Sequence, residues 1–101
     1  MRLLNAALAA GATPLASVKP RQQATVRGEL VSVTLMPVHD AHWLRAELSD
    51  GSGILNLVWM GRRTVPGIKA GATLTVKGRV TLEDDGRQVM YNPCYELESV
   101  D

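Results

Sequence analysis

The side chains best suited to binding a ligand in this 101-residue chain are a tryptophan, an asparagine and several basic residues of its central part. An indole ring stacks on flat rings, an amide pairs with hydrogen-bonding edges, and basic groups bind phosphate oxygens. Together these groups are typical of a surface that binds nucleic acid. The candidate binding residues are Trp43, Arg45, Asn56, Arg62, Arg63, Lys77 and Arg79.

Most candidates also have a purely structural alternative. Trp43 could pack under the N-terminal segment. The basic side chains other than Arg45 could form a solvated surface with Glu29 and Glu47 as partners; they are Arg27, Arg62, Arg63, Lys77 and Arg79. The acidic run 83–85 would repel a phosphate backbone. We therefore expect binding that is modest and strongly salt-sensitive.

The sequence contains no Ser-His-Asp spacing, Gly-rich phosphate loop or zinc-hydrolase motif. His39, Asp40 and His42 lie close together, but three donors without a nearby fourth are a weak metal signal. Cys94 is the single cysteine, and we expect a buried, inert thiol. The sequence thus predicts a protein that is not an enzyme and that uses no metal and no cofactor.

Composition indicates one domain without a long-range electrostatic field. Eleven Lys and Arg face ten Asp and Glu, so any charged site must be local. No run approaches the roughly 20 apolar residues of a membrane-spanning helix. The apolar start of the chain is short and lacks a small-residue cleavage site. We therefore expect a cytoplasmic protein with no membrane partner.

Alternation of apolar and polar residues predicts five strands over residues 24–97, centred on a hairpin at 42–60. Asp50-Gly51-Ser52-Gly53 forms its loop, because Asp and Gly tolerate the positive φ of tight connections. The predicted register sets Leu48 opposite Leu55, Ala46 opposite Leu57 and Leu44 opposite Trp59. It leaves six side chains pointing outward: Trp43, Arg45, Glu47, Asn56, Val58 and Met60.

The first strand, 24–36, is expected to bulge at Gly28 and to end at Pro37. Its predicted inward residues are Val26, Val31, Val33 and Leu35. A loop at 61–71 leads to a fourth strand with Leu74, Val76, Gly78, Val80 and Leu82 on one face. An acidic turn ending at Gly86 leads to the fifth strand, kinked at Asn92-Pro93.

The N-terminal part, 1–22, is expected to form a short helix at 1–10 followed by an irregular strap, and 23–101 to form the barrel. The pattern is that of an all-β, five-stranded Greek-key barrel, the OB-fold. An SH3-like barrel is the nearest alternative, since strand count alone does not separate the two.

Several short motifs also carry a resemblance that covers most of the chain. In order they are Gly11-Ala12-Thr13-Pro14-Leu15, Val26-Arg27-Gly28-Glu29, Asp50-Gly51-Ser52-Gly53, Val58-Trp59-Met60-Gly61-Arg62-Arg63, Val65-Pro66-Gly67-Ile68, Gly71, Lys77-Gly78-Arg79-Val80 and Asn92-Pro93-Cys94-Tyr95-Glu96-Leu97. The chain resembles the small OB-fold nucleic-acid-binding domain proteins of actinobacteria. It is more distantly similar to the wedge domain of RecG-type helicases and to the OB-folds that read tRNA anticodons.

An OB-fold binds oligonucleotides on the face of its second and third strands, between the loops that follow strands one and four. We therefore expect a non-enzymatic module that binds single-stranded or branched DNA or RNA there. The alternative is a protein-interaction or homo-oligomerising module that uses an apolar patch of Trp43, Val58 and Met60.

Overall fold

The computed structural model describes residues 14–98. They form a single curled mixed β-sheet, mostly antiparallel, and one 3-10 turn. The strand order in the sheet is β5-β6-β3-β2-β1-β4-β7. The elements are η1 (Leu15–Ser17), β1 (Gln23–Val38), β2 (Ala41–Ser49), β3 (Ile54–Trp59), β4 (Thr73–Arg79), β5 (Thr81–Leu82), β6 (Gln88–Tyr91) and β7 (Cys94–Leu97). The helix predicted at 1–10 lies outside the described residues.

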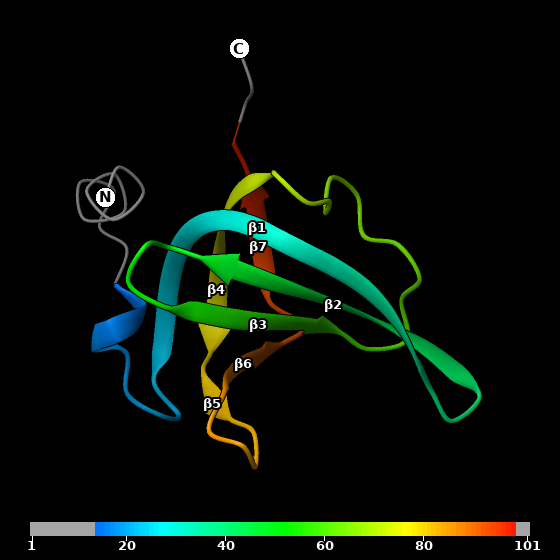
Figure 1. Ribbon diagram of the computed structural model, residues 1–101, viewed down its shortest axis with the longest axis horizontal. Coiled ribbons are helices and arrows are strands. Elements are labelled where there is room, and N and C mark those ends of the chain that lie inside the picture. Colours follow the sequence, from blue (N-terminus) through cyan, green and yellow to red (C-terminus); the bar gives the residue numbers. More distant parts are fainter. Residues whose placement is uncertain (1–13, 99–101) are drawn as a thin grey trace.

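The seven segments are the five predicted strands, because two of them are interrupted. Only Val80 separates β4 from β5, and only Asn92 and Pro93 separate β6 from β7. Antiparallel pairing of β1 with β4 and parallel pairing of β3 with β6 close the sheet around one core. Figure 1 shows β2 and β3 crossing β4 and β7 steeply, as opposite walls of a small barrel do. This topology confirms the predicted OB-fold.

The central hairpin has the predicted register. Leu48 pairs with Leu55, Ala46 with Leu57 and Leu44 with Trp59, and all six are buried in the core. At the end of the hairpin, Trp59 packs edge-on against Tyr95 with ring centroids 5.8 Å apart. The register follows from the sequence because a one-residue shift would turn every apolar side chain toward solvent.

The predicted bulge exists, but its position was wrong. The register of β1 on β2 shifts between Leu30 and Ser32, so Val31 points outward with 52% of its surface exposed. Gly28 serves another purpose, because a Cβ there would lie 2.3 Å from the carbonyl oxygen of Ser49. Leu30 takes the inward position that was predicted for Val31.

The first two strands continue past the barrel as a projecting arm, which Figure 1 shows at the right. Pro37 does not end β1 as predicted, since it pairs with His42 and the strand runs to Val38. Leu35 is consequently exposed rather than buried, because it lies on the arm. Leu82 and Cys94, both expected in the core, are exposed as well, because β5 and β7 are short strands at the two ends of the sheet.

The strap before β1 is held against the barrel by the carboxylate of Asp50, which is fully buried. Asp50 Oδ2 accepts a hydrogen bond from the Leu15 N–H at 2.7 Å. Its Oδ1 accepts from Ser52 N–H, Ser52 Oγ–H and Gly53 N–H at 2.8, 2.8 and 3.1 Å. The β2–β3 turn and the strap are therefore fastened to one side chain, and the Leu15 side chain enters the core.

Candidate binding face

The outward side chains of β2, β3 and β6 form one continuous surface, which we call the outer face. Strand pairing arranges it in rows across the sheet. The first row is Glu47, Asn56 and Val89, and the second is Arg45, Val58 and Tyr91. Trp43, which pairs with Met36 of β1, and Met60 continue the face beyond the last paired residues of β2 and β3.

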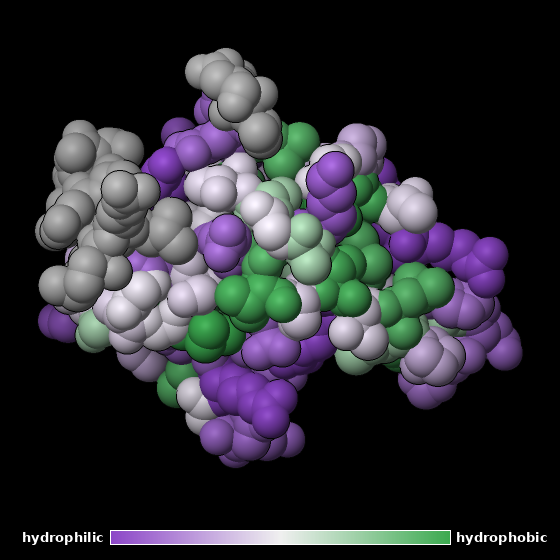
Figure 2. All heavy atoms as spheres, turned by 45° about the horizontal axis from the view of Figure 1, so that its top comes forward, coloured by the Kyte–Doolittle hydropathy of each residue, from purple (hydrophilic) through white to green (hydrophobic). Residues whose placement is uncertain are grey.

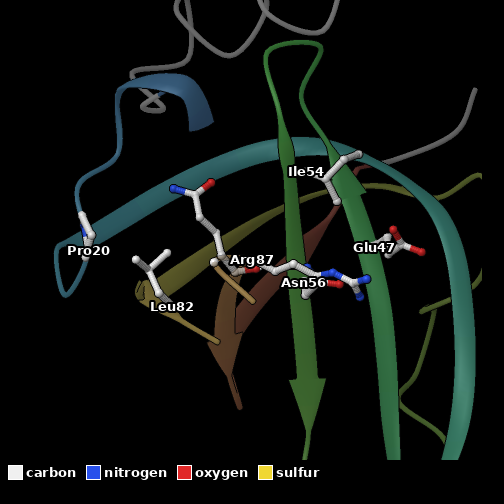
Figure 3. A pocket seen from close by; sticks show the side chains of 8 residues that line it. Pro20, Glu47, Ile54, Asn56, Leu82 and Arg87 are labelled. Carbon is white, nitrogen blue, oxygen red and sulfur yellow. The ribbon is translucent and has the colours of Figure 1, made fainter. Parts of the chain in front are cut away.

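A groove of about 690 Å³ opens at the first row. It is lined by Pro20, Glu47, Ile54, Asn56, Leu82, Gly86, Arg87 and Gln88. These residues come from the strap, the β2–β3 hairpin, β5, the turn after it and the start of β6, and Figure 3 shows Arg87 extending across β3 toward Glu47. A volume of this order accommodates a group of small-molecule size.

Hydrogen bonds fix the polar side chains of the groove. Asn56 Nδ2 donates to the Gln88 carbonyl at 3.1 Å, and Ser32 Oγ donates to Glu47 Oε1 at 2.8 Å. Gln88 Nε2 donates to the Val18 carbonyl of the strap at 3.4 Å. Asn56 points outward as predicted, but it is only 4% exposed and its Nδ2 is bonded to the backbone of β6.

The second row is bridged by an ion pair between Arg45 and Glu83. Arg45 Nη1 donates to Glu83 Oε2 at 3.3 Å, and Nη2 donates to Oε1. The hydrogen bond to Glu83 raises the pKa of Arg45 above its ordinary value. No acidic partner was predicted for Arg45, so the pairing with Glu83 is new information from the structure.

Val58 and Val89 point away from the core, yet they are 1% and 0% exposed. Val58 and Val89 lie on β3 and β6, which are between β2 and β5 in the sheet. The ion pair of Arg45 on β2 with Glu83 after β5 therefore spans the two strands that carry these valines. The predicted apolar patch of Trp43, Val58 and Met60 is therefore wrong for Val58. Val58 offers almost no surface to a partner.

Three large side chains with accessible surface lie around the second row and beyond it. Met60 and Tyr91 are exposed, and Trp43 is half-buried. Tyr91 was missed by the sequence reasoning, although the run Val89-Met90-Tyr91 carries the signal. Met90 faces the core, so both of its neighbours must face outward.

The remaining basic candidates lie in two places. Arg62 and Arg63 are exposed and follow Met60 after Gly61, and within residues 14–98 neither forms an ion pair. Lys77 and Arg79 lie on β4, which β1 separates from β2. Arg79 Nη1 donates to the Arg21 carbonyl at 3.0 Å. The structure therefore places Arg62 and Arg63 at the end of the outer face, but not Lys77 or Arg79.

Figure 2 shows a band of hydrophobic surface across the middle of the molecule, with hydrophilic side chains gathered toward the projecting arm and along the lower edge. Exposed large hydrophobic residues number seven in the part of the chain described here: Val31, Leu35, Ile54, Met60, Leu82, Tyr91 and Leu97. Three of them, Ile54, Met60 and Tyr91, belong to β3 and β6 or follow β3 directly. The outer face thus combines apolar surface with a few charged groups.

Residues 14–98 hold neither a cluster of metal-binding side chains nor a membrane-spanning helix. No three His, Cys, Asp or Glu side chains gather there as metal ligands would. No helix in that range has the length and apolar character needed to cross a membrane.

Comparisons with known proteins rest on structure, since no family model and no curated protein matches the chain. One similar solved structure is RecG bound to a three-way DNA junction, with a TM-score of 0.63 and 23% identity over 85% of this chain. The match covers only 12% of the RecG chain. Another is the second OB-fold domain of replication protein A from Methanococcus maripaludis, with a TM-score of 0.64 and 15% identity. It aligns with 88% of this chain and 98% of that domain. Topology and both likenesses agree that the chain is an OB-fold, as the resemblance to RecG predicted.

Proposed function

We propose that the protein is a non-enzymatic module that binds single-stranded or branched nucleic acid on its outer face. The observation that carries this proposal is the groove on β2 and β3 beside the β5–β6 turn, with aromatic side chains farther along the same face. In OB-folds this face, between the loops after strands one and four, is where oligonucleotides bind.

The order of groups along the face supports a single-stranded ligand. Residues two apart on a strand are separated by about 6.6 Å, so Glu47 and Trp43 lie about 13 Å apart along β2. A strand laid along β2 would meet the groove first and the rings of Tyr91 and Trp43 next. Base stacking on such rings contributes roughly 1 to 3 kcal/mol per base and tolerates any sequence.

The charges of the face support modest, salt-sensitive binding. Arg45 is already paired with Glu83, so it is not free to contact a phosphate while the pair is intact. Arg62 and Arg63 are exposed and supply positive charge at the Met60 end. Phosphate contacts from these two arginines would make affinity fall as salt rises, and their small number keeps the affinity modest.

The two similar structures agree with this proposal. One is a protein bound to a three-way DNA junction, and the other is a domain of replication protein A. Because the identities are low and the RecG match covers a small share of that protein, these likenesses support a nucleic-acid-binding OB-fold, whereas the choice of face and ligand rests on the geometry above.

The experiment is a fluorescence titration with 12-nucleotide single-stranded DNA and RNA of mixed sequence at two salt concentrations. The chain has two tryptophans, and Trp59 is buried in the core, so quenching reports mainly on Trp43. We expect saturable quenching that weakens as salt rises. The variant Trp43→Phe should lose most of the signal while calorimetry still detects binding. Absence of binding to either strand by calorimetry would refute the proposal.

A further inference from the structure

The groove presents two hydrogen-bond acceptors, one from Asn56 and one from Glu47, that no described residue occupies. Asn56 Nδ2 donates to the Gln88 carbonyl, which fixes the orientation of the amide, because only its nitrogen can donate to that oxygen. Asn56 Oδ1 is therefore the free end of the amide. Among residues 14–98, no donor forms a hydrogen bond with it.

Glu47 presents a second acceptor beside the first. Its Oε1 accepts from Ser32, which leaves Oε2 without a hydrogen bond from the described residues. Glu47 and Asn56 are directly opposite each other on β2 and β3. Directly opposed residues have Cβ atoms about 4.5 to 5.5 Å apart, so one bound group can meet both side chains.

Donors in the groove are largely committed elsewhere. Gln88 Nε2 donates to the strap at Val18, and Arg87 Nε pairs with Asp85 at 3.0 Å. The Nη groups of Arg87 form no hydrogen bond within residues 14–98, but this side chain is 65% exposed and is not fixed in the groove as Glu47 and Asn56 are. The remaining walls, which include Ile54 and Leu82, are apolar. The groove thus combines apolar sides with two adjacent acceptors, which suits a flat ring that carries a donor group.

We infer that this groove binds a nucleobase through an exocyclic amino group, and so prefers cytosine, adenine or guanine to thymine and uracil. The inference rests on the proposed function and adds a chemical preference to it. An amino group offers two N–H donors, one for Asn56 Oδ1 and one for Glu47 Oε2.

Uracil carries a carbonyl oxygen where cytosine carries its amino group. In the groove, that oxygen would face the Glu47 carboxylate, and the neighbouring N3–H of uracil would be a single donor for the two acceptors. A site built to bond a donor group rejects an analogue that lacks it more strongly than an apolar pocket rejects a change of size. Discrimination should therefore come from this position rather than from the shape of the ring.

The test compares two strands that differ in this group, a dC 12-mer and a dU 12-mer, by calorimetry at pH 7.5. We expect dC to bind about fivefold more tightly than dU, the size of effect that one additional hydrogen-bonding group produces. In Glu47→Gln, the amide can donate to a carbonyl as well as accept, so the dC to dU ratio should fall below about twofold.

The matched control is Glu96→Gln, which removes one exposed carboxylate from β7, on a different part of the sheet. Both variants remove one negative charge, so both raise affinity for any strand to some extent, but only Glu47→Gln should change the ratio. Equal binding of dC and dU by the unaltered protein would overturn the inference while leaving the proposed function intact. Failure of both strands and of the mixed sequence to bind would overturn both.

Discussion

Arg45 of β2 and Glu83 of the turn after β5 are joined by a two-bond ion pair across 38 residues of sequence, and the pair spans the outer face. A side chain that could bind phosphate is thus held by a carboxylate of the same chain. An anionic strand must compete with Glu83 for Arg45. Glu83 therefore acts as an internal competitor of the ligand.

The first prediction follows from this competition. Glu83→Gln should tighten binding of a mixed 12-mer by about fivefold, because a neutral amide releases the guanidinium more easily. The salt dependence should steepen by about one phosphate contact. Asp84→Asn removes the same charge from the same turn, and Asp84 forms no ion pair within residues 14–98. Equal gains in the two variants would mean that net charge, not release of Arg45, is responsible.

Tyr91 should contribute a stacking surface. Tyr91→Ala is expected to weaken binding of the 12-mer by about tenfold, since loss of one stacked base costs roughly 1 to 3 kcal/mol. Stability should change little, because the ring is exposed. Leu35→Ala, at an equally exposed position on the arm, serves as the control and should bind normally. Unchanged affinity of Tyr91→Ala would remove this ring from the site.

Basic residues should matter by position rather than by number. The double variant Arg62→Ala with Arg63→Ala should reduce the slope of log affinity against log salt by about two. The double variant Lys69→Ala with Lys77→Ala removes the same charge away from the outer face and should leave the slope nearly unchanged. Identical slopes in the two double variants would place the phosphate contacts elsewhere.

The buried carboxylate of Asp50 should be a major determinant of stability. Asp50→Ala leaves the N–H groups of Leu15, Ser52 and Gly53 without their acceptor, and we expect a loss of about 3 kcal/mol in the free energy of unfolding. Urea denaturation followed by circular dichroism measures it. Asp40→Ala, at the exposed tip of the arm, should change stability by less than about 0.5 kcal/mol. A similarly small effect at Asp50 would contradict the anchoring role.

Gly28 should tolerate no side chain. In Gly28→Ala the new Cβ would meet the Ser49 carbonyl oxygen at 2.3 Å, which requires the two strands to separate. We expect a loss of about 3 kcal/mol or more. Gly61→Ala has open space around it and strains only a φ of +70°, so its cost should be near 1 kcal/mol. Thermal unfolding of the two variants compares them, and equal shifts would show that close packing at Gly28 is unimportant.

The sequence predicted the barrel and the central hairpin because both depend on local signals. Alternation decides which side chains of 42–60 face the core, and the Asp-Gly-Ser-Gly loop fixes the pairing of the two strands. The predicted position of the bulge was wrong because a glycine within a strand can mark either a bulge or the close approach of another backbone. Gly28 makes room for a neighbouring strand, whereas the bulge is at Val31.

The candidate site was predicted less completely because the residues that bury or pair its side chains come from distant parts of the chain. Nothing near Arg45 in sequence indicates Glu83, and nothing near Val58 indicates that it is buried. Tyr91 reaches the face through a parallel pairing of β3 with β6 that local patterns do not specify. Single-strand periodicity therefore tells which way a side chain points, but not whether another segment covers it.

The strap fastened by Asp50 has a consequence for exchange kinetics. Its Leu15 amide is bonded to the hairpin turn, and its Val18 carbonyl accepts from Gln88, a residue that also lines the groove. Detachment of the strap would open the groove on that side, so a ligand that fills the groove should shift the balance toward the attached state. The Leu15 amide, some 35 residues from its acceptor, should then exchange with deuterium more slowly when the groove is occupied.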